Sequence, residues 1–60
     1  MKWNRREVIP PRDRPILIYC PDFNVCGYSV CTWDGFKYCK DDYPEFDKFV
    51  QLWALFLEAD

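Results

Sequence analysis

The chain has 60 residues, of which half are hydrophobic and 20% are aromatic, and a net charge of -2. A chain of this length forms one domain (residues 1–60) near the lower size at which a single core offsets the entropy of folding. The acidic balance disfavours direct nucleic-acid binding, and no apolar run is long enough to span a membrane.

The first segment, residues 1–14, reads as a basic, proline-rich arm in front of a globular core over residues 15–60. It carries most of the positive charge, whereas residues 40–60 are predominantly acidic. We expect the two ends to approach each other and partly neutralise, with the alternative that the acidic end attracts a basic partner. No signal-peptide pattern follows Met1, so a cytoplasmic location with reduced cysteines is expected.

The next segments predict β-strands. Residues 16–20 are apolar on both faces and rich in β-branched side chains, which indicates a central strand. Turn-forming residues follow at 21–24, and residues 25–33 read as a second strand. The dipeptide Asp34-Gly35 then predicts a two-residue hairpin turn, after which residues 36–39 return as a third strand.

This hairpin predicts which side chains share a face. Trp33 is expected opposite Phe36, and Cys31 opposite Tyr38, with all four on the core face. The other face is expected to carry Tyr28, Val30, Thr32, Lys37 and Cys39. Either the closing segment half covers that face, or the face is a contact patch.

The closing segment is ambiguous. Apolar residues over 44–57 fall at helical spacing, and they also alternate as in a strand. The fold expected is mainly β, a small single-domain antiparallel β-meander with a closing strand. The alternative is an α+β fold in which a β-hairpin sheet is followed by a C-terminal helix over residues 44–57.

The order of several short pieces resembles a short phage and prophage domain of unknown function. The pieces are Trp3, Pro10-Pro11, a Pro-Ile-Leu-Ile-Tyr strand at 15–19, Trp33-Asp34-Gly35, and Val50-Gln51-Leu52-Trp53. That family closes on Val-Thr-His-Trp-Met-Pro-Leu-Pro, whereas this chain has Leu52 in place of the histidine and lacks the closing prolines. The resemblance implies an accessory protein acting in an infected bacterium, with no reaction attached.

The chemistry-bearing residues point away from catalysis and metal binding. The chain has no histidine and one serine, and none of its four cysteines forms a Cys-x-x-Cys pair. The predicted hairpin also puts Cys31 and Cys39 on opposite faces, so buried reduced thiols are expected instead of a zinc site. We therefore expect no enzyme activity, no catalytic residues, no metal and no cofactor.

The function expected is a phage-encoded protein-binding module that inhibits or redirects a bacterial host protein, with antiviral defence as a candidate target. Its expected partner-binding residues are aromatic or acidic and lie near two turns: Phe23, Tyr28, Asp41, Asp42, Tyr43 and Glu45. The alternatives are a small zinc-binding module and a self-assembling structural protein. The sequence leaves the oligomeric state open.

Overall fold

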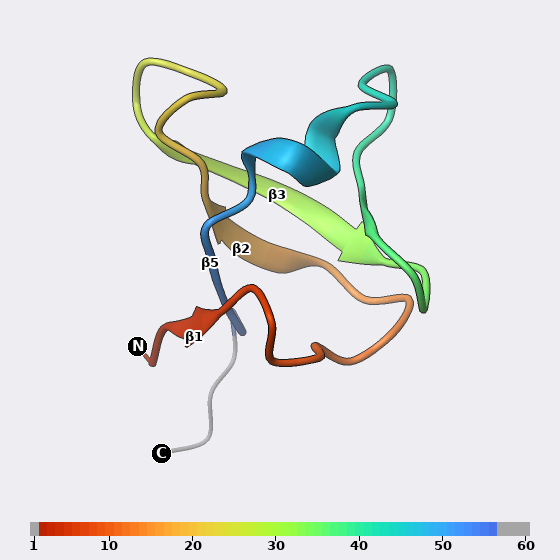
Figure 1. Cartoon of the computed structure of the whole chain (residues 1–60). Coiled ribbons are helices and arrows are strands. Elements are labelled where there is room, and N and C mark those ends of the chain that lie inside the picture. The colour runs from red at the N-terminus through yellow and green to blue at the C-terminus, as the bar shows by residue number, and fades with distance from the viewer. Residues whose placement is uncertain (1, 57–60) are drawn as a thin grey trace.

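The protein is mainly β, as expected from its sequence. A computed structural model describes residues 2–56, which form one five-stranded antiparallel sheet and one short 3-10 helix (Figure 1). The elements in chain order are β1 (Asn4–Arg5), β2 (Ile16–Tyr19), β3 (Tyr28–Trp33), β4 (Tyr38–Cys39), η1 (Phe46–Phe49) and β5 (Leu52–Ala54). The order of strands across the sheet is β1-β5-β2-β3-β4.

Strand β2 lies at the centre of the sheet, which confirms the prediction from its two apolar faces. It pairs with β3 on one side, where Ile16 lies opposite Cys31, and with β5 on the other, where Ile18 lies opposite Trp53. Strands β2, β3 and β4 follow one another as a meander. Strand β5 then returns to the far side of β2, so the last strand of the chain lies between the first two.

The turn between β3 and β4 differs from the predicted hairpin. Trp33 pairs with Tyr38 and Thr32 with Cys39, so residues 34–37 form a four-residue loop. The Asp34 carboxylate explains the longer loop, because its Oδ1 accepts the backbone N–H groups of Phe36 (2.7 Å) and Lys37 (2.9 Å). Such a side-chain bond gives the backbone an alternative to a tight turn.

The longer loop moves Phe36 out of the core and leaves the facing of the cysteines unchanged. Phe36 is 92% exposed, so its predicted place on the core face was wrong. The pairing shifts by two residues, and side chains alternate with a period of two along a strand. Cys31 and Cys39 therefore still point to opposite faces, as predicted.

Over residues 44–56, the closing segment contains a strand and no α-helix. The 3-10 helix η1 covers four residues and ends at Val50, whose backbone is extended, and β5 follows directly. The helix predicted as the alternative over 44–57 does not form within the described residues, which end at 56. Pairing of Leu52 with Tyr19 places the segment in the sheet, where tertiary contacts override its helical spacing.

Part of the basic arm belongs to the sheet. Strand β1 pairs with β5, and the next residue, Arg6, reaches the short helix. Its guanidinium donates to the backbone oxygens of Asp47 (2.8 Å) and Val50 (3.0 Å) and to the Asp47 carboxylate (3.0 Å). The expected approach of the two chain ends is therefore seen in this ion pair.

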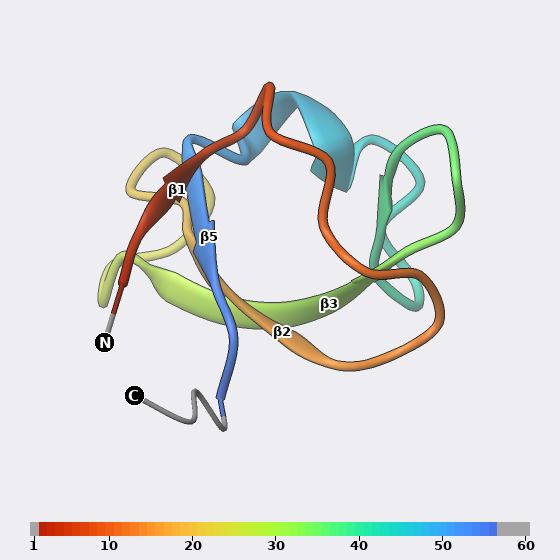
Figure 2. The same ribbon diagram turned by 90° about the horizontal axis from the view of Figure 1, so that it is seen from below.

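The core lies on one face of the sheet, here called the inner face. Figure 2 shows η1 and β1 across from β2 and β3, with the inner face between them. Tyr38 and Phe46 close the core, and the Tyr38 hydroxyl donates to the backbone oxygen of Arg6 at 2.8 Å. The buried residues of the core are Ile16, Ile18, Cys20, Cys31, Tyr38, Phe46, Val50 and Trp53.

Candidate protein-binding surface

Five of the six predicted contact residues lie close together on the surface. Phe23, from the β2–β3 loop, meets Tyr43, from the segment before η1, with ring centroids 5.0 Å apart and rings nearly perpendicular. Asp42 and Glu45 flank Tyr43 in the chain and line the same hollow. Asp41 lines a neighbouring hollow that also includes Tyr43. We call these five residues the acidic–aromatic surface.

Tyr28 lies apart from them. Its ring is 6.0 Å from Trp3 and 5.6 Å from Tyr19, at the opposite end of β3 from the β3–β4 loop. It therefore belongs to a second aromatic group, formed by Trp3, Tyr19 and Tyr28. The sequence placed Phe23 and Tyr28 together because they are near in the chain, whereas the β2–β3 loop separates them.

A shallow hollow of about 170 Å³ forms the middle of the acidic–aromatic surface. Its floor is made of rings, because Phe23 packs edge-on against Phe46 at 4.8 Å and lies 5.5 Å from Phe49. Phe46 is buried, so it anchors the half-exposed rings around it to the core. A hollow with a ring floor and a polar rim suits a side chain from another protein.

The loop that carries the acidic residues is a defined turn. The Tyr43 N–H donates to the Lys40 carbonyl at 3.1 Å, and these two residues form an isolated bridge. Asp42 adopts a φ of 67°, a left-handed conformation that aspartate tolerates better than most residues. The turn presents Tyr43, which is 49% exposed, between two carboxylates.

The chain's own lysines occupy part of the rim. Lys48 donates to the Glu45 carboxylate at 2.8 Å, and this bond lowers the pKa of Glu45. The Lys48 ammonium also lies 5.3 Å from the Phe49 ring centroid, and that of Lys40 lies 5.9 Å from the Phe46 ring centroid. These contacts show that ammonium groups can lie over the faces of these rings.

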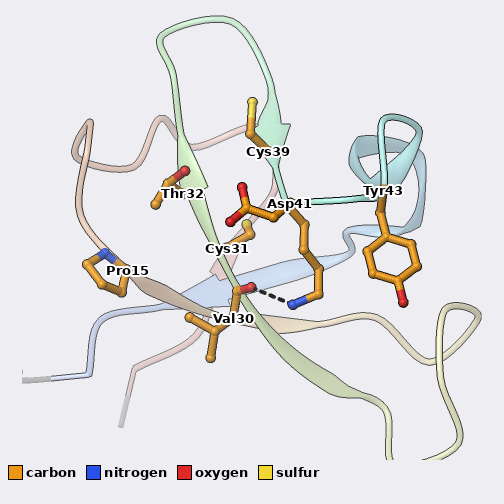
Figure 3. Close-up of a pocket in the computed structure, with 8 residues that line it drawn as sticks. Pro15, Val30, Cys31, Thr32, Cys39, Asp41 and Tyr43 are labelled. Atoms are coloured by element: carbon orange, nitrogen blue, oxygen red, sulfur yellow. Dashed lines mark hydrogen bonds between the residues drawn. The ribbon is translucent and has the colours of Figure 1, made fainter.

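The neighbouring hollow, of about 330 Å³, lies at the open edge of β3, between that strand and the segment from Cys39 to Tyr43 (Figure 3). Val30, Cys31 and Thr32 line it from β3, and Asp41 lines it from the loop after β4. The Cys39 sulfur is directed away from Asp41, toward the Asp34 carboxylate. Lys40 crosses the edge of β3 and donates to the Val30 carbonyl at 3.1 Å. The hollow therefore links the edge of β3 with the acidic–aromatic surface through Tyr43.

The outer face of the sheet is apolar. The sequence predicted only its β3–β4 part, the face that carries Tyr28 and Val30. The register aligns Arg5, Leu52, Tyr19 and Tyr28 in one row across four strands, and Leu17 with Val30 in the next. An antiparallel sheet with one solvated face normally alternates apolar and polar residues. Here most outward positions are aromatic or aliphatic. The feature of the sequence that indicated this was the alternate positions of β3, Tyr28 and Val30.

The closing segment does not cover this outer face, because β5 joins the sheet beside β2. Tyr28 remains 48% exposed and Val30 41% exposed. Of the two interpretations of this face, the one in which the closing segment packs over it was wrong. Ala54, which lies in the same outward row as Leu17 and Val30, is fully buried, so the exposed part of this face is limited to its β3 side and Trp3.

The four cysteines are free thiols in two different environments. Cys20 and Cys31 are buried as predicted, and burial raises the pKa of Cys31 to about 12, so it stays neutral. Cys26 is exposed, and Cys39 is partly exposed with its Sγ 3.2 Å from the Asp34 carboxylate, so the expected burial was wrong for these two. Residues 2–56 contain no group of three cysteine or acidic side chains arranged to hold a metal ion.

Comparison with known proteins does not assign the chain to a family. No family model, curated protein or solved structure matches it. Over residues 2–56, no helix is both long and apolar enough to cross a membrane. A functional hypothesis must therefore come from the geometry of the surface.

Proposed function

We propose that the protein is a small protein-binding module that engages a basic surface of a bacterial host protein through the acidic–aromatic surface, and thereby inhibits or redirects it. A component of antiviral defence is one candidate target, and the bacterial cytoplasm is the corresponding location. The observation that carries the proposal is the contact of Phe23 with Tyr43 in a hollow rimmed by Asp42 and Glu45. Large rings at a hollow with a charged rim are typical of interface anchors.

The surface supports binding better than catalysis. The side chains of Asp41, Asp42 and Glu45 are exposed to solvent, whereas a carboxylate pair that performs acid–base catalysis is normally enclosed. Both hollows are shallow and open to solvent. An exposed carboxylate beside a ring is suited to attract and orient a basic partner, which raises the rate of association.

The two alternative functions have less support. Cys31 and Cys39 point to opposite faces, which is unfavourable for a shared tetrahedral zinc site. For head-to-tail assembly through the basic arm, Arg6 is already engaged by Asp47 of the same chain. Neither alternative uses the hollow at Tyr43.

A pull-down from a bacterial lysate with the tagged full chain tests the proposal. The variant Asp42→Asn/Glu45→Gln removes two charges, and asparagine keeps the left-handed conformation at 42. We expect the wild type to retain a stoichiometric host protein, and this variant and Tyr43→Ser to lose it. The control, Phe36→Ser, changes a more exposed ring in the β3–β4 loop and should retain the partner. Equal capture by all four proteins, or none by the wild type, contradicts the proposal.

A further inference from the structure

The hollow in the acidic–aromatic surface is lined by aromatic rings that face different directions. The Phe23 ring stands nearly perpendicular to the Tyr43 ring (87°) and to the Phe46 ring (89°). It makes an angle of 56° with the Phe49 ring. Phe46 is 1% exposed and lies at the bottom of the hollow, whereas Tyr43 is 49% exposed and lies at its side. A small group in the hollow therefore contacts rings from more than one direction.

The size of the hollow fits the end of one side chain. Its volume of about 170 Å³ is below the roughly 300–1,000 Å³ of pockets that enclose a drug-sized ligand. A whole cofactor or a folded segment of a partner does not fit in this space. One side chain that projects from the surface of a partner does fit.

The charge around the hollow favours a cation. Among the described residues, its lining includes two acidic side chains and no basic one. The charged residues of the surface and its margin are three acidic and two basic: Asp41, Asp42, Glu45, Lys40 and Lys48. The face of an aromatic ring is also negative, because of the ring quadrupole, and it attracts an ammonium or guanidinium group. Rings and carboxylates therefore favour the same kind of ligand.

One of the chain's own lysines shows how an ammonium group binds at this surface. The Lys48 ammonium lies 5.3 Å from the Phe49 ring centroid and donates to the Glu45 carboxylate at 2.8 Å. Both of these partners line the hollow. The Lys48 side chain is 61% exposed and that of Glu45 is 76% exposed, so this ion pair is weak and another cation can replace it. The other nearby lysine, Lys40, lines the neighbouring hollow and donates to the Val30 carbonyl.

We infer that the hollow binds the ammonium group of one lysine side chain on the host protein, in competition with Lys48. The inference rests on the proposed function for the source of the lysine, and it adds the chemistry that the hollow selects. A lysine ammonium is a compact charge on a flexible four-carbon stem, so it can enter a hollow and contact several rings. An arginine guanidinium is planar and stacks on a single ring face, an arrangement that rings at steep angles do not favour.

Titration of the purified full chain with single-residue probes, followed by two-dimensional NMR of the backbone amides, tests the inference without a host protein. The probes are the Nα-acetyl N-methylamide derivatives of lysine, norleucine and arginine. Norleucine keeps the four-carbon stem of lysine and lacks the ammonium group. We expect the lysine probe to shift the amide signals of Tyr43, Glu45 and Phe49, and to bind about tenfold more tightly than either other probe. Equal binding of norleucine or arginine, or no shift with lysine at millimolar concentration, overturns the inference.

A pair of tyrosine variants tests the contribution of the rings. Tyr43→Leu removes one ring of the hollow and keeps an apolar side chain, so the lysine probe should bind about fivefold more weakly. Tyr28→Leu is the matched control, because Tyr28 is 48% exposed, close to the 49% of Tyr43, and lies outside the hollow. It should bind the probe as the wild type does. Equal affinities of the two variants contradict a role of the ring at position 43.

A pair of lysine variants tests the competition. Lys48→Gln removes the internal ammonium and frees the Glu45 carboxylate, so the lysine probe should bind about threefold more tightly. Lys37→Gln makes the same change in net charge in the β3–β4 loop and should leave the affinity unchanged. A damaged fold weakens binding, so a gain of affinity distinguishes competition from damage. If Lys48→Gln binds the probe no more tightly than Lys37→Gln, the competition is refuted.

These experiments use no host protein, so this inference and the proposed function fail separately. Binding of the lysine probe together with a pull-down that recovers nothing supports lysine recognition and contradicts the host partner. Capture of a host protein through Tyr43 together with no preference for the lysine probe supports the partner and overturns lysine recognition.

Discussion

The inner and outer faces of the sheet come from the same strands and differ in what covers them. On β2, Ile16 and Ile18 point inward and are fully buried, whereas Leu17 and Tyr19 point outward and are partly exposed. Both sets are apolar, so composition does not distinguish the faces. The inner face is more buried because η1, Tyr38 and the start of the chain form a layer that covers it. Substitutions of similar size on the two faces should therefore have very different effects.

The largest effect is expected on the inner face. Ile18→Ala removes a fully buried side chain next to Trp53 and leaves a cavity, which should lower the free energy of unfolding by about 2–5 kcal/mol. Chemical denaturation followed by tryptophan fluorescence measures it. Ile18→Val is the matched control, with an expected loss of about 1 kcal/mol. A loss of less than 1 kcal/mol for the alanine variant would place Ile18 outside the core.

The next effect concerns the layer that covers the inner face. Arg6→Met removes the three hydrogen bonds to Asp47 and Val50 that join β1 to η1, and should lower the free energy of unfolding by about 2 kcal/mol. Arg14→Met, at an exposed position of the basic arm, is the control for the loss of positive charge. If the free energy of unfolding falls by the same amount in both variants, Arg6 stabilises the fold through its positive charge and not through its contacts with the helix.

A smaller effect, dependent on pH, is expected at the β3–β4 loop. Hydrogen bonds from the backbone of Lys37 and then Phe36 lower the pKa of Asp34 from 3.8 to about 2. A carboxylate whose pKa is lower in the folded state stabilises it above the unfolded-state pKa, and this contribution is lost as the pH falls from about 4 to 2. Asp34→Asn should therefore be less stable than the wild type at neutral pH and equally stable near pH 2. Acid unfolding of both proteins measures this, and an unchanged difference across that range would contradict it.

The smallest effect is expected on the outer face when the chain is dilute. Val30→Thr changes a half-exposed side chain with no covering layer, so its free energy of unfolding should change by less than about 0.5 kcal/mol at low micromolar concentration. Thermal unfolding measures this change. A large loss at dilution would show that the outer face is buried within one chain.

The sequence predicted the strands better than their connections. β-Branched residues and two apolar faces identified β2 as the central strand, and alternation along β3 predicted the opposite facing of Cys31 and Cys39. The turn was wrong because Asp34 bonds two backbone N–H groups in the loop, and a dipeptide rule does not include that bond. The closing strand was weakly specified, since its residues suit a helix until β2 and β1 supply partners.

The candidate site was predictable in part. Phe23, Asp42, Tyr43 and Glu45 were expected as contacts for their chemistry, and the fold brings them to one hollow. Tyr28 was placed in the same group because it is close to Phe23 in the sequence. Closeness in the sequence says little about the distance between two residues on either side of a loop. The outer face was not predicted as one surface, since it depends on Arg5, Leu52 and Tyr19, which come from three distant parts of the chain.

The edge of β3 is a feature with consequences for solubility. Strand β4 pairs only with Thr32 and Trp33, so within the described residues no strand lies beside Tyr28 to Cys31 on that side. The Lys40 side chain crosses this edge and donates a hydrogen bond to the Val30 carbonyl. Open strand edges promote fibril growth, and a lysine on the edge opposes it. The ammonium group therefore lies where it opposes the addition of another strand to this edge, a role distinct from folding and from binding.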